Sequence, residues 1–438
     1  MEALKKVEQL KERQDADYYL TSLLITPLSK NLVQSPYLSV EFFIRQKKKF
    51  QFRDMNGEIG GDVNAARMIR LQGRNYAVIA NADAMGKSMQ GAMGSLVFAS
   101  VFHAIIKRTQ NVKSMQDLPP ELWLRDAFRE LDEVFIGFDY KMLISILISL
   151  VDEQTGFMYF MEAEHPRLAL YRNNEASYIE SEFKNDKLGM DLKARELYVE
   201  TFQLLPGDAV IYGSDGRDDV EIKEGEKKYI QMDPCFFLER VREGQGELPL
   251  IFSSLESKGR ITDDLSLIRL SYTGIGEEDF EKQGRGSGAL NVNGNRERAQ
   301  FSETSLERLR QAVGENVENL ETAALLLDGY IQAGLFEPAA TLAEQIVKFH
   351  PDRPEFLTIA WENWKKAGHY EAALEAAERF YIRGIKDEEN LMTLASLNLR
   401  DKNLDRARAM LDEILRLNPR RPDALELREN LNGNSRVP

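Results

Sequence analysis

Aspartates beside glycines or next to short apolar runs recur in four segments of the sequence. The segments are "EIGGD" ending at Asp62, "NADAMGKS" around Asp83, "VIYGSDGRDD" around Asp215, and "GRITDDLSLIRL" with Asp263 and Asp264. Glycine lets the backbone approach another group closely, and carboxylates at strand ends suit a hard divalent cation. Each segment alone is better explained as an ordinary turn, because Asp and Gly are the commonest turn residues. Together, beside strands, they predict a metal site.

The segment "NADAMGKS" also ends like a phosphate-binding P-loop. That motif is G-x-x-x-x-G-K-[ST], and Asn81 stands where its first glycine should be. A strand, a loop and a helix are expected here, as in a P-loop, but Asp83 would repel phosphate held by backbone N–H groups and one lysine. We therefore favour a metal ligand at Asp83 over a P-loop NTPase. Nucleotide binding that requires Lys87 would support the P-loop.

The elements that must position these aspartates are strands interrupted by one helical block. Short apolar runs typical of strands are "NYAVIANAD", "KMLISILISLV", "GFMYFME", "RLALYR", "DAVIYGSD" and "LSLIRLSY". Helical spacing marks "GAMGSLVFASVFHAIIKR" and "PPELWLRDAFRELDEVF". This pattern predicts an α+β fold with helices packed on sheets.

The end of the chain has a different organisation, with a repeat of 34 residues. The repeating positions are Phe336, Tyr370 and Leu404; Ala339, Ala373 and Ala407; Ala343, Ala377 and Leu411; and Gly334 and Gly368, with Lys402 third. Pro351 and Pro419 lie two steps apart. The pattern resembles tetratricopeptide (TPR) repeats, with residues 423–432 as a cap. An ordinary helical bundle is the alternative.

Composition limits the remaining possibilities. The chain has 438 residues and a formal charge of −14, which argues against nucleic acid as a partner. A single cysteine, Cys235, excludes an internal disulfide, and four histidines make a His-rich zinc site a poor explanation. We expect no membrane span, because no apolar run approaches the ~20 residues required. The charged N-terminus lacks a secretory apolar region, so we expect a cytoplasmic protein.

The acidic segments, taken with two others, resemble the SpoIIE/RsbU type of bacterial PPM (type-2C-like) serine/threonine phosphatases. In that family a GGD segment, a "GD-x-x-GKG" loop entering a helix, an "AGHP" turn, a "pGD…YTDG" strand end and a "DDIT" strand follow in order. Here they are matched by "EIGGD", "ADAMGKS", "AEHP", "LPGDAVIYGSDG" and "TDDLSL", and "KLGM" resembles the family's Leu-Gly element. The resemblance covers residues 20–272, in the family's order.

This resemblance implies a PPM-phosphatase-like α-β-β-α sandwich followed by an all-α TPR solenoid. The expected domains are an N-terminal signalling or dimerisation helix over 1–20, a phosphatase domain over 21–273, a flexible linker over 274–300, and a TPR-like domain over 301–438.

The resemblance also implies a centre of two divalent cations, manganese or magnesium. Its catalytic ligands would be the carboxylates of Asp62, Asp83, Asp215 and Asp263, with the backbone carbonyl of Ala84. Either aspartate of "DD" could be the metal ligand; Asp263 is favoured, with Asp264 as a contact behind the ligands. Asp219 could bind a third metal or its water, and Lys87 could steer substrate phosphate or simply be solvated. A water activated by the cations would attack phosphorus, so no protein nucleophile is needed.

Several positions depart from the family pattern. Met85 stands where some PPM enzymes have a histidine general acid, and His165 in "AEHP" is better explained as fixing a turn than as a catalytic acid. The other departures are Ala82, Ser88 and Glu164 in place of glycines, and Val63-Asn64 after "GGD". None removes a ligand, but they could make activity conditional.

The favoured interpretation is a phosphoserine/phosphothreonine phosphatase in bacterial signalling. The resemblance implies a partner-switching role on a phosphorylated anti-sigma-factor antagonist, with the TPR domain recruiting an unknown protein. Residues 92–108 and 120–136 and the N-terminal helix would regulate it, through a homodimer of that helix. The alternative is a catalytically silent phosphatase-like scaffold, although a scaffold has no need for four mutually repelling acids.

Overall fold

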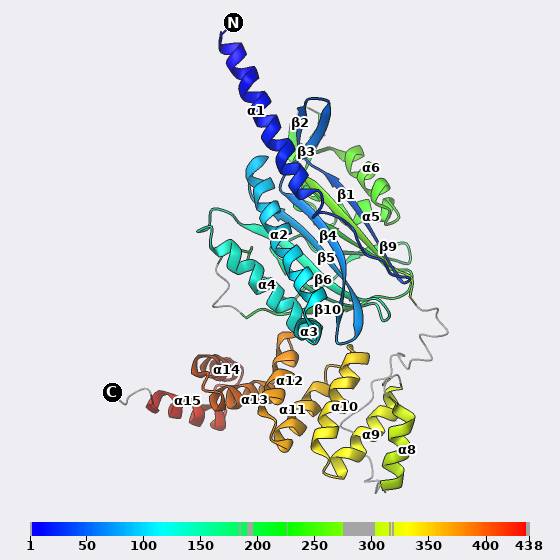
Figure 1. Ribbon diagram of the computed structural model, residues 1–438, viewed down its shortest axis with the longest axis vertical. Coiled ribbons are helices and arrows are strands. Elements are labelled where there is room, and N and C mark those ends of the chain that lie inside the picture. Colours follow the sequence, from blue (N-terminus) through cyan, green and yellow to red (C-terminus); the bar gives the residue numbers. More distant parts are fainter. Residues whose placement is uncertain are drawn as a thin grey trace. The chain divides into compact units, whose positions relative to one another are not determined.

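The computed structural model describes residues 2–183, 185–190, 196–225, 227–274, 303–314, 317 and 319–434. The chain forms two compact units, residues 1–276 and 277–438 (Figure 1). The predicted linker over 274–300 lies, apart from Gly274, outside the described residues.

Two antiparallel five-stranded sheets form the centre of the first unit (Figure 1). The first has the order β10 (Glu200–Gln203), β7 (Phe157–Ala163), β6 (Ile144–Asp152), β5 (Arg74–Ala84) and β4 (Asp62–Leu71). The second has the order β1 (Leu38–Arg45), β15 (Leu265–Tyr272), β11 (Ala209–Gly213), β8 (Ala169–Arg172) and β9 (Glu175–Tyr178). The six strands predicted from apolar runs are confirmed as β5, β6, β7, β8, β11 and β15.

Helices cover the outer face of each sheet. The first sheet packs against α2 (Met89–Asn111) and α4 (Pro120–Ile136), which the short α3 (Lys113–Gln116) separates. The second sheet packs against α5 (Phe236–Glu243) and α6 (Leu248–Lys258). Between the sheets lies a third apolar cluster that includes Ile79, Leu147 and Ile268. The predicted α-β-β-α sandwich is therefore present.

Smaller elements lie at the margins of the sandwich. β2 (Lys48–Phe52) and β3 (Met55–Ile59) form a hairpin, and β12 (Val220–Glu224) pairs with both β13 (Lys227–Ile230) and β14 (Arg260–Ile261).

The first helix, α1 (Glu2–Ile25), contains the segment over 1–20 that was expected to signal or dimerise, and its last turns pack on the β2–β3 hairpin. The ring of Tyr18 lies 6.0 Å from that of Phe50, and Tyr18 is buried. Leu4 and Leu10, nearer the N-terminus, are about two-thirds exposed. The helix is thus anchored at one end and presents apolar side chains to solvent at the other.

Contrary to the sequence expectation, α2 is long and apolar enough to span a membrane by length and composition. Half of its most apolar window is buried within the domain, and Phe98 and Phe102 belong to the core cluster against the first sheet. Its apolar composition is that of a helix covered by a sheet on one side and by α4 on another.

The second unit is a run of antiparallel helices. They are α8 (Glu303–Val313), α9 (Leu320–Gln332), α10 (Phe336–Phe349), α11 (Phe356–Ala367), α12 (Tyr370–Ile382), α13 (Glu388–Arg400), α14 (Leu404–Leu417) and α15 (Pro422–Asn434). The repeating alanines are fully buried. Gly334, Gly368 and Lys402 precede α10, α12 and α14 and share a positive φ (72°, 84° and 61°), so the repeat persists in backbone conformation even where lysine replaces glycine.

Candidate metal centre

The first pair of candidate ligands comes from the hairpin of β4 and β5. In the register of these strands, Asp62 lies directly opposite Asp83. Opposed residues in a sheet have β-carbons only ~4.5–5.5 Å apart, and like charges in this relation are destabilising. The folded chain therefore holds two carboxylates where only a proton or a cation relieves their repulsion.

Asp62 is almost completely buried. Its Oδ2 accepts a hydrogen bond of 2.6 Å from the Ser214 hydroxyl. Its Oδ1, also buried, has no hydrogen-bond partner among the described residues. Burial, followed by the charges of Asp83 and Asp264, raises the pKa of Asp62 well above its usual value. A buried carboxylate oxygen without a partner requires an explanation, and a cation ligand is one.

Asp83 ends β5 and is the centre of the cluster. Burial, followed by the negative charges of Asp215, Asp264 and Asp263, raises the pKa of Asp83 to about 7. These charges come from two segments distant in sequence from Asp83, so the fold brings together aspartates that the sequence singled out. Without a cation, burial and the neighbouring charges favour the protonated form of Asp83.

Asp215 begins a single 3₁₀ turn, η2 (Asp215–Arg217), directly after β11. Burial, followed by the charges of Asp219 and Asp263, raises the pKa of Asp215 to about 6. The backbone of Asp219 links two acidic segments, because its N–H donates to the Asp215 carbonyl at 2.9 Å and its carbonyl accepts from Thr262 at 2.9 Å. The pKa of Asp219 is raised by partial burial and then by Asp263.

The two adjacent aspartates before β15 differ in their contacts. Asp264 Oδ1 accepts from the Lys47 N–H at 2.6 Å, and Oδ2 accepts from the Gly61 N–H at 2.9 Å. Burial outweighs these hydrogen bonds and raises the pKa of Asp264. Among the described residues, Asp263 Oδ1 accepts only from the adjacent Asp264 N–H, at 2.9 Å. The contacts leave Asp263 freer than Asp264 to ligate a cation.

The glycines of "EIGGD" are required by close approach. A β-carbon on Gly61 would lie 2.4 Å from the Ala84 carbonyl oxygen and 2.9 Å from Asp83 Oδ1. One on Gly60 would lie 2.2 Å from Asp264 Oδ2. Any larger residue would fill the space in which these oxygens converge.

No group of three or more His, Cys, Asp or Glu side chains in the described ranges is arranged to hold a metal ion as it stands. The donor set nevertheless fits a divalent cation: all candidates are oxygens, they repel one another, and one buried oxygen has no partner. The residues present fit the cations that the sequence resemblance implies.

A buried polar network lies behind the acids, and sequence reasoning missed it. Asn81 Nδ2 donates to Asn64 Oδ1 at 2.6 Å and to the Ser266 hydroxyl at 2.8 Å. Asn81 Oδ1 lies 2.6 Å from His165 Nε2, and His165 Nδ1 lies 3.1 Å from the Ser145 hydroxyl. Because Asn81 Oδ1 can only accept, His165 carries its proton on Nε2. The network joins β4, β5, β6 and β15 beneath the candidate centre.

His165 is a neutral, structural group in this geometry. Burial, followed by the charges of Arg217 and Lys187, lowers its pKa to about 3. Both ring nitrogens are engaged by Asn81 and Ser145, which agrees with fixing a turn rather than with proton donation.

Two lysines have fields that reach the acids. Lys187, in "KLGM", lowers the pKa values of both Asp83 and Asp215 against the prevailing upward shifts, and Lys47 lowers those of Asp219 and Asp264. Lys87, the predicted phosphate-steering residue, is exposed, and its role stays a prediction. Lys187 comes from a loop after β9 and is brought here only by tertiary structure, so its spacing from the acids gave no signal.

Two replacements of family glycines keep the glycine conformation. Ser88, before α2, has φ 56° and ψ −113°, and Glu164 has φ 41°. Side chains rarely adopt such a backbone, and it costs of order 1–3 kcal/mol per residue. Met85 is exposed beside Asp83 and offers no proton.

Residues 73–273 match the family described as "Stage II sporulation protein E (SpoIIE)". The chain contains a SpoIIE/PPM-type serine/threonine phosphatase domain. The match includes Asp83, Asp215, Asp219, Asp263 and Asp264 of the SpoIIE-type domain but begins after Asp62, which the strand register places with them. No curated protein matches the chain.

Solved structures similar to the SpoIIE-type domain include three bacterial proteins. The RsbU and RsbW domains of Rv1364c from Mycobacterium tuberculosis are 17% identical over 55% of this chain and 62% of that chain, with a TM-score of 0.41. The SpoIIE phosphatase domain from Bacillus subtilis is 16% identical over 56% and 66%, with a TM-score of 0.39. The SiaA-PP2C domain of Pseudomonas aeruginosa is 15% identical over 62% and 98%, with a TM-score of 0.44. The chain thus spans less than two thirds of the first two.

Proposed function

We propose that the SpoIIE-type domain is a metal-dependent phosphatase acting on phosphoserine or phosphothreonine in a protein. The observation that carries the proposal is that Asp62 lies opposite Asp83. The charges of three further aspartates raise the pKa of Asp83, and these are Asp215, Asp263 and Asp264. Such a cluster destabilises the fold unless a cation binds there.

In this proposal Asp62, Asp83, Asp215 and Asp263, with the Ala84 carbonyl, hold two divalent cations, manganese or magnesium. Asp264 and Asp219 support them, in the roles the resemblance implies. RsbX has been solved in complex with magnesium, and the catalytic domain of the serine/threonine protein phosphatase PstP in complex with two manganese ions. When bound, the cations would supply an activated water and neutralise phosphate charge.

The protein residues have separable tasks around that chemistry. Lys187 is the cation placed to attract substrate phosphate, with Lys87 as the second candidate on the loop. Gly60 and Gly61 keep the space between the strands open, and the Asn81–His165 network fixes the ends of the strands. Neither His165 nor Met85 donates a proton, so the leaving seryl oxygen would take its proton from water.

The wider role that we propose is bacterial signalling in the cytoplasm. The substrate would be a phosphorylated anti-sigma-factor antagonist in a partner-switching pathway. The helices of the second unit would be TPR repeats binding another protein, as supported by the 34-residue period of buried alanines and positive-φ residues. The exposed apolar side chains of α1, Leu4 and Leu10 among them, support a homodimer through that helix.

A catalytically silent scaffold is the second candidate. It is favoured by the strained backbone at Ser88 and Glu164 and by the absence of a histidine at Met85. A scaffold would bind phosphoprotein without turnover.

The test is manganese-dependent hydrolysis of p-nitrophenyl phosphate and of a phosphoserine peptide by the full chain. We expect turnover that falls at least about a hundredfold in Asp83→Asn, because removal of a ligand removes transition-state stabilisation. Asp117→Asn, an exposed carboxylate after α3, is the matched control and should retain turnover. Metal binding without turnover would favour the scaffold. No metal binding, by calorimetry, would refute the centre itself.

A further inference from the structure

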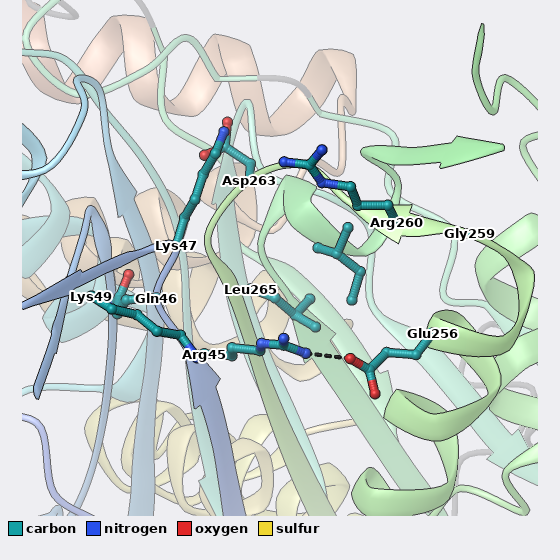
Figure 2. Close-up of a pocket in the computed structure, with 10 residues that line it drawn as sticks. Arg45, Gln46, Lys47, Lys49, Glu256, Gly259, Arg260, Asp263 and Leu265 are labelled. Carbon is teal, nitrogen blue, oxygen red and sulfur yellow. Dashed lines mark hydrogen bonds and ion pairs between the residues drawn. The ribbon is translucent and has the colours of Figure 1, made fainter. Parts of the chain in front are cut away.

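A small basic pocket adjoins the candidate metal centre. It measures about 270 Å³ and is formed where β1 runs into β2 and where α6 runs into β14 (Figure 2). Asp263, one of the predicted ligands, is among its lining residues. The pocket and the centre therefore share a wall.

The charge of this pocket opposes that of the chain. Four cationic side chains line it, and only Glu256 and Asp263 oppose them. The cationic residues are Arg45, Lys47, Lys49 and Arg260. In a chain of net charge −14, a local excess of cations beside a cluster of acids creates a field suited to an anion.

The cations are not equally available. Arg45 pairs with Glu256 and lies over the Phe252 ring, 5.2 Å from its centroid, and Lys49 lies 3.4 Å from Glu58. The Lys47 ammonium donates to the Thr262 carbonyl, a neutral partner, and its charge is opposed only in part, by the nearby carboxylates of Asp219 and Asp264.

Arg260 is the most available of the four. Among the described residues, its guanidinium has no ion-pair or hydrogen-bond partner. It extends across the pocket toward the end at which Lys47 and Asp263 lie (Figure 2). A guanidinium is suited to two parallel hydrogen bonds to a carboxylate or phosphate.

The size of the pocket limits the ligand. Sites that enclose drug-sized molecules measure ~300–1,000 Å³, so this pocket suits one side chain better than a whole cofactor. Its shared wall with the centre means that a chain bound at the centre would pass its mouth. An extended chain advances ~3.3 Å per residue, so a side chain within a few residues of the phosphorylated one is the candidate to enter the pocket.

We propose that this pocket binds an anionic side chain of the substrate protein, near the phosphoserine, and so selects phosphorylated segments with an acidic neighbour. The inference rests on the proposed function, because it assumes that a phosphoprotein segment lies at the candidate centre. The anion is a carboxylate or a second phosphate, and both would be held by Arg260 with Lys47.

Binding of non-hydrolysable peptides tests the proposal without requiring catalysis. Fluorescent peptides carry a phosphonate analogue of phosphoserine and, at positions two to four on either side, glutamate, glutamine or phosphoserine. Fluorescence anisotropy with the full chain and Mn²⁺ gives the preference for each anionic peptide over the glutamine peptide. We expect a preference of roughly fivefold for at least one anionic series, reduced by salt, as for partly exposed ion pairs.

Three variants locate the preference. Arg260→Ala should abolish the preference for the anionic peptide, and Arg260→Lys should keep most of it, because lysine retains the positive charge. Arg260 is exposed, so we expect both variants to fold, and a melting curve would verify this. Arg70→Ala, an exposed arginine near the far end of β4 from Asp62, is the matched control and should leave it unchanged. The series with the larger loss in Arg260→Ala identifies the anion as carboxylate or phosphate.

Equal binding of all peptides, or a preference that survives Arg260→Ala, would overturn the proposal. Either result is distinct from failure of the proposed phosphatase activity, which the hydrolysis of p-nitrophenyl phosphate reports separately.

Discussion

At the scale of single residues, the buried imidazole of His165 makes stability depend on pH. Its pKa is lowered from 6.5 to about 3 in the folded chain, so between these values the unfolded chain binds a proton that the folded chain does not. The free energy of unfolding therefore falls as pH decreases through this window, by up to about 1.4 kcal/mol per pH unit from this group.

Urea titrations of wild type and His165→Gln between pH 7 and 4 would measure that slope. The difference in free energy of unfolding should shrink as pH falls, because only the wild type has this imidazole to protonate. A difference independent of pH would mean that the imidazole is not kept neutral by burial.

The strained serine before α2 gives a second prediction at this scale. Ser88→Gly should raise the free energy of unfolding by about 1 kcal/mol, because glycine tolerates φ 56° and ψ −113°. The same exchange at Ser100, exposed within α2, should lower it by about 1 kcal/mol, since glycine is a poor helix residue. Chemical denaturation of both variants checks the opposite signs; a loss at both sites would show that Ser88 is not strained.

The candidate ligands could be predicted because each stands in a local pattern of acid and glycine beside an apolar run. The roles of Lys187, Asn81 and Arg260 could not be predicted in the same way. Lys187 lies in the noted segment "KLGM" and Asn81 in "NADAMGKS", but the contacts of all three join segments far apart in the chain, and no local pattern shows which groups they meet.

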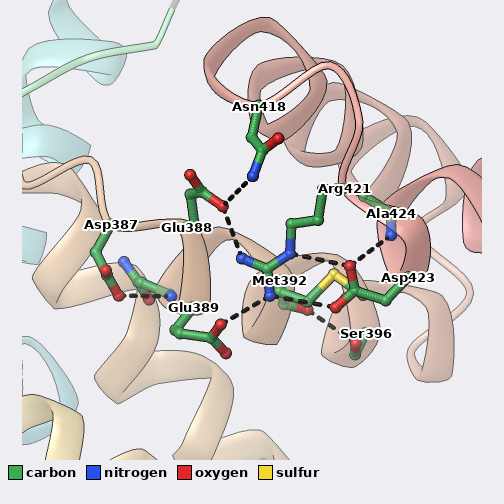
Figure 3. Close-up of polar contacts among 10 residues, drawn as sticks. Asp387, Glu388, Glu389, Met392, Ser396, Asn418, Arg421, Asp423 and Ala424 are labelled. Carbon is green, nitrogen blue, oxygen red and sulfur yellow. Dashed lines mark hydrogen bonds and ion pairs between the residues drawn. The ribbon is translucent and has the colours of Figure 1, made fainter.

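At the scale of elements, Arg421 holds the last helices of the second unit together. Its guanidinium contacts Glu388 at 3.0 Å, Glu389 at 2.8 Å and Asp423 at 2.9 Å, and so links the start of α13 to the start of α15 (Figure 3). These acids raise the pKa of Arg421. One cation serving three acids is a network rather than an isolated surface pair.

Arg421→Ala should therefore lower the free energy of unfolding of the second unit by about 1–2 kcal/mol. Arg408→Ala, which removes an exposed pair with Asp405, should cost less than about 0.5 kcal/mol. Thermal melting followed by circular dichroism compares the two. Equal losses would mean that the Arg421 contacts contribute no more than a solvated surface pair.

Several of the long strands of the two sheets could be predicted from the sequence, because their apolar runs are continuous. β6 is buried along its whole length and shows it as the apolar run "ISILISLV". The β2–β3 hairpin was missed because "KKFQF" is mostly polar, and its apolar contacts are made with α1 rather than within a sheet core.

At the scale of the whole molecule, the two compact units should unfold as separate transitions. Calorimetry of the full chain should show two, and Mn²⁺ should raise the melting temperature of only the one that belongs to residues 1–276, because ligand binding stabilises the state that binds it. The isolated residues 1–276 identify that transition. A single transition, shifted as a whole by Mn²⁺, would show that the units unfold cooperatively.

The repulsion between the opposed Asp62 and Asp83 lowers the stability of the metal-free domain and at the same time favours the binding of cations. A variant with asparagine at either position would lose repulsion, and it would survive heating better than the parent when chelator is present. A screen for heat-resistant variants carried out in chelator would therefore collect proteins that have lost their ligands. Carried out in manganese, the same screen would reject them.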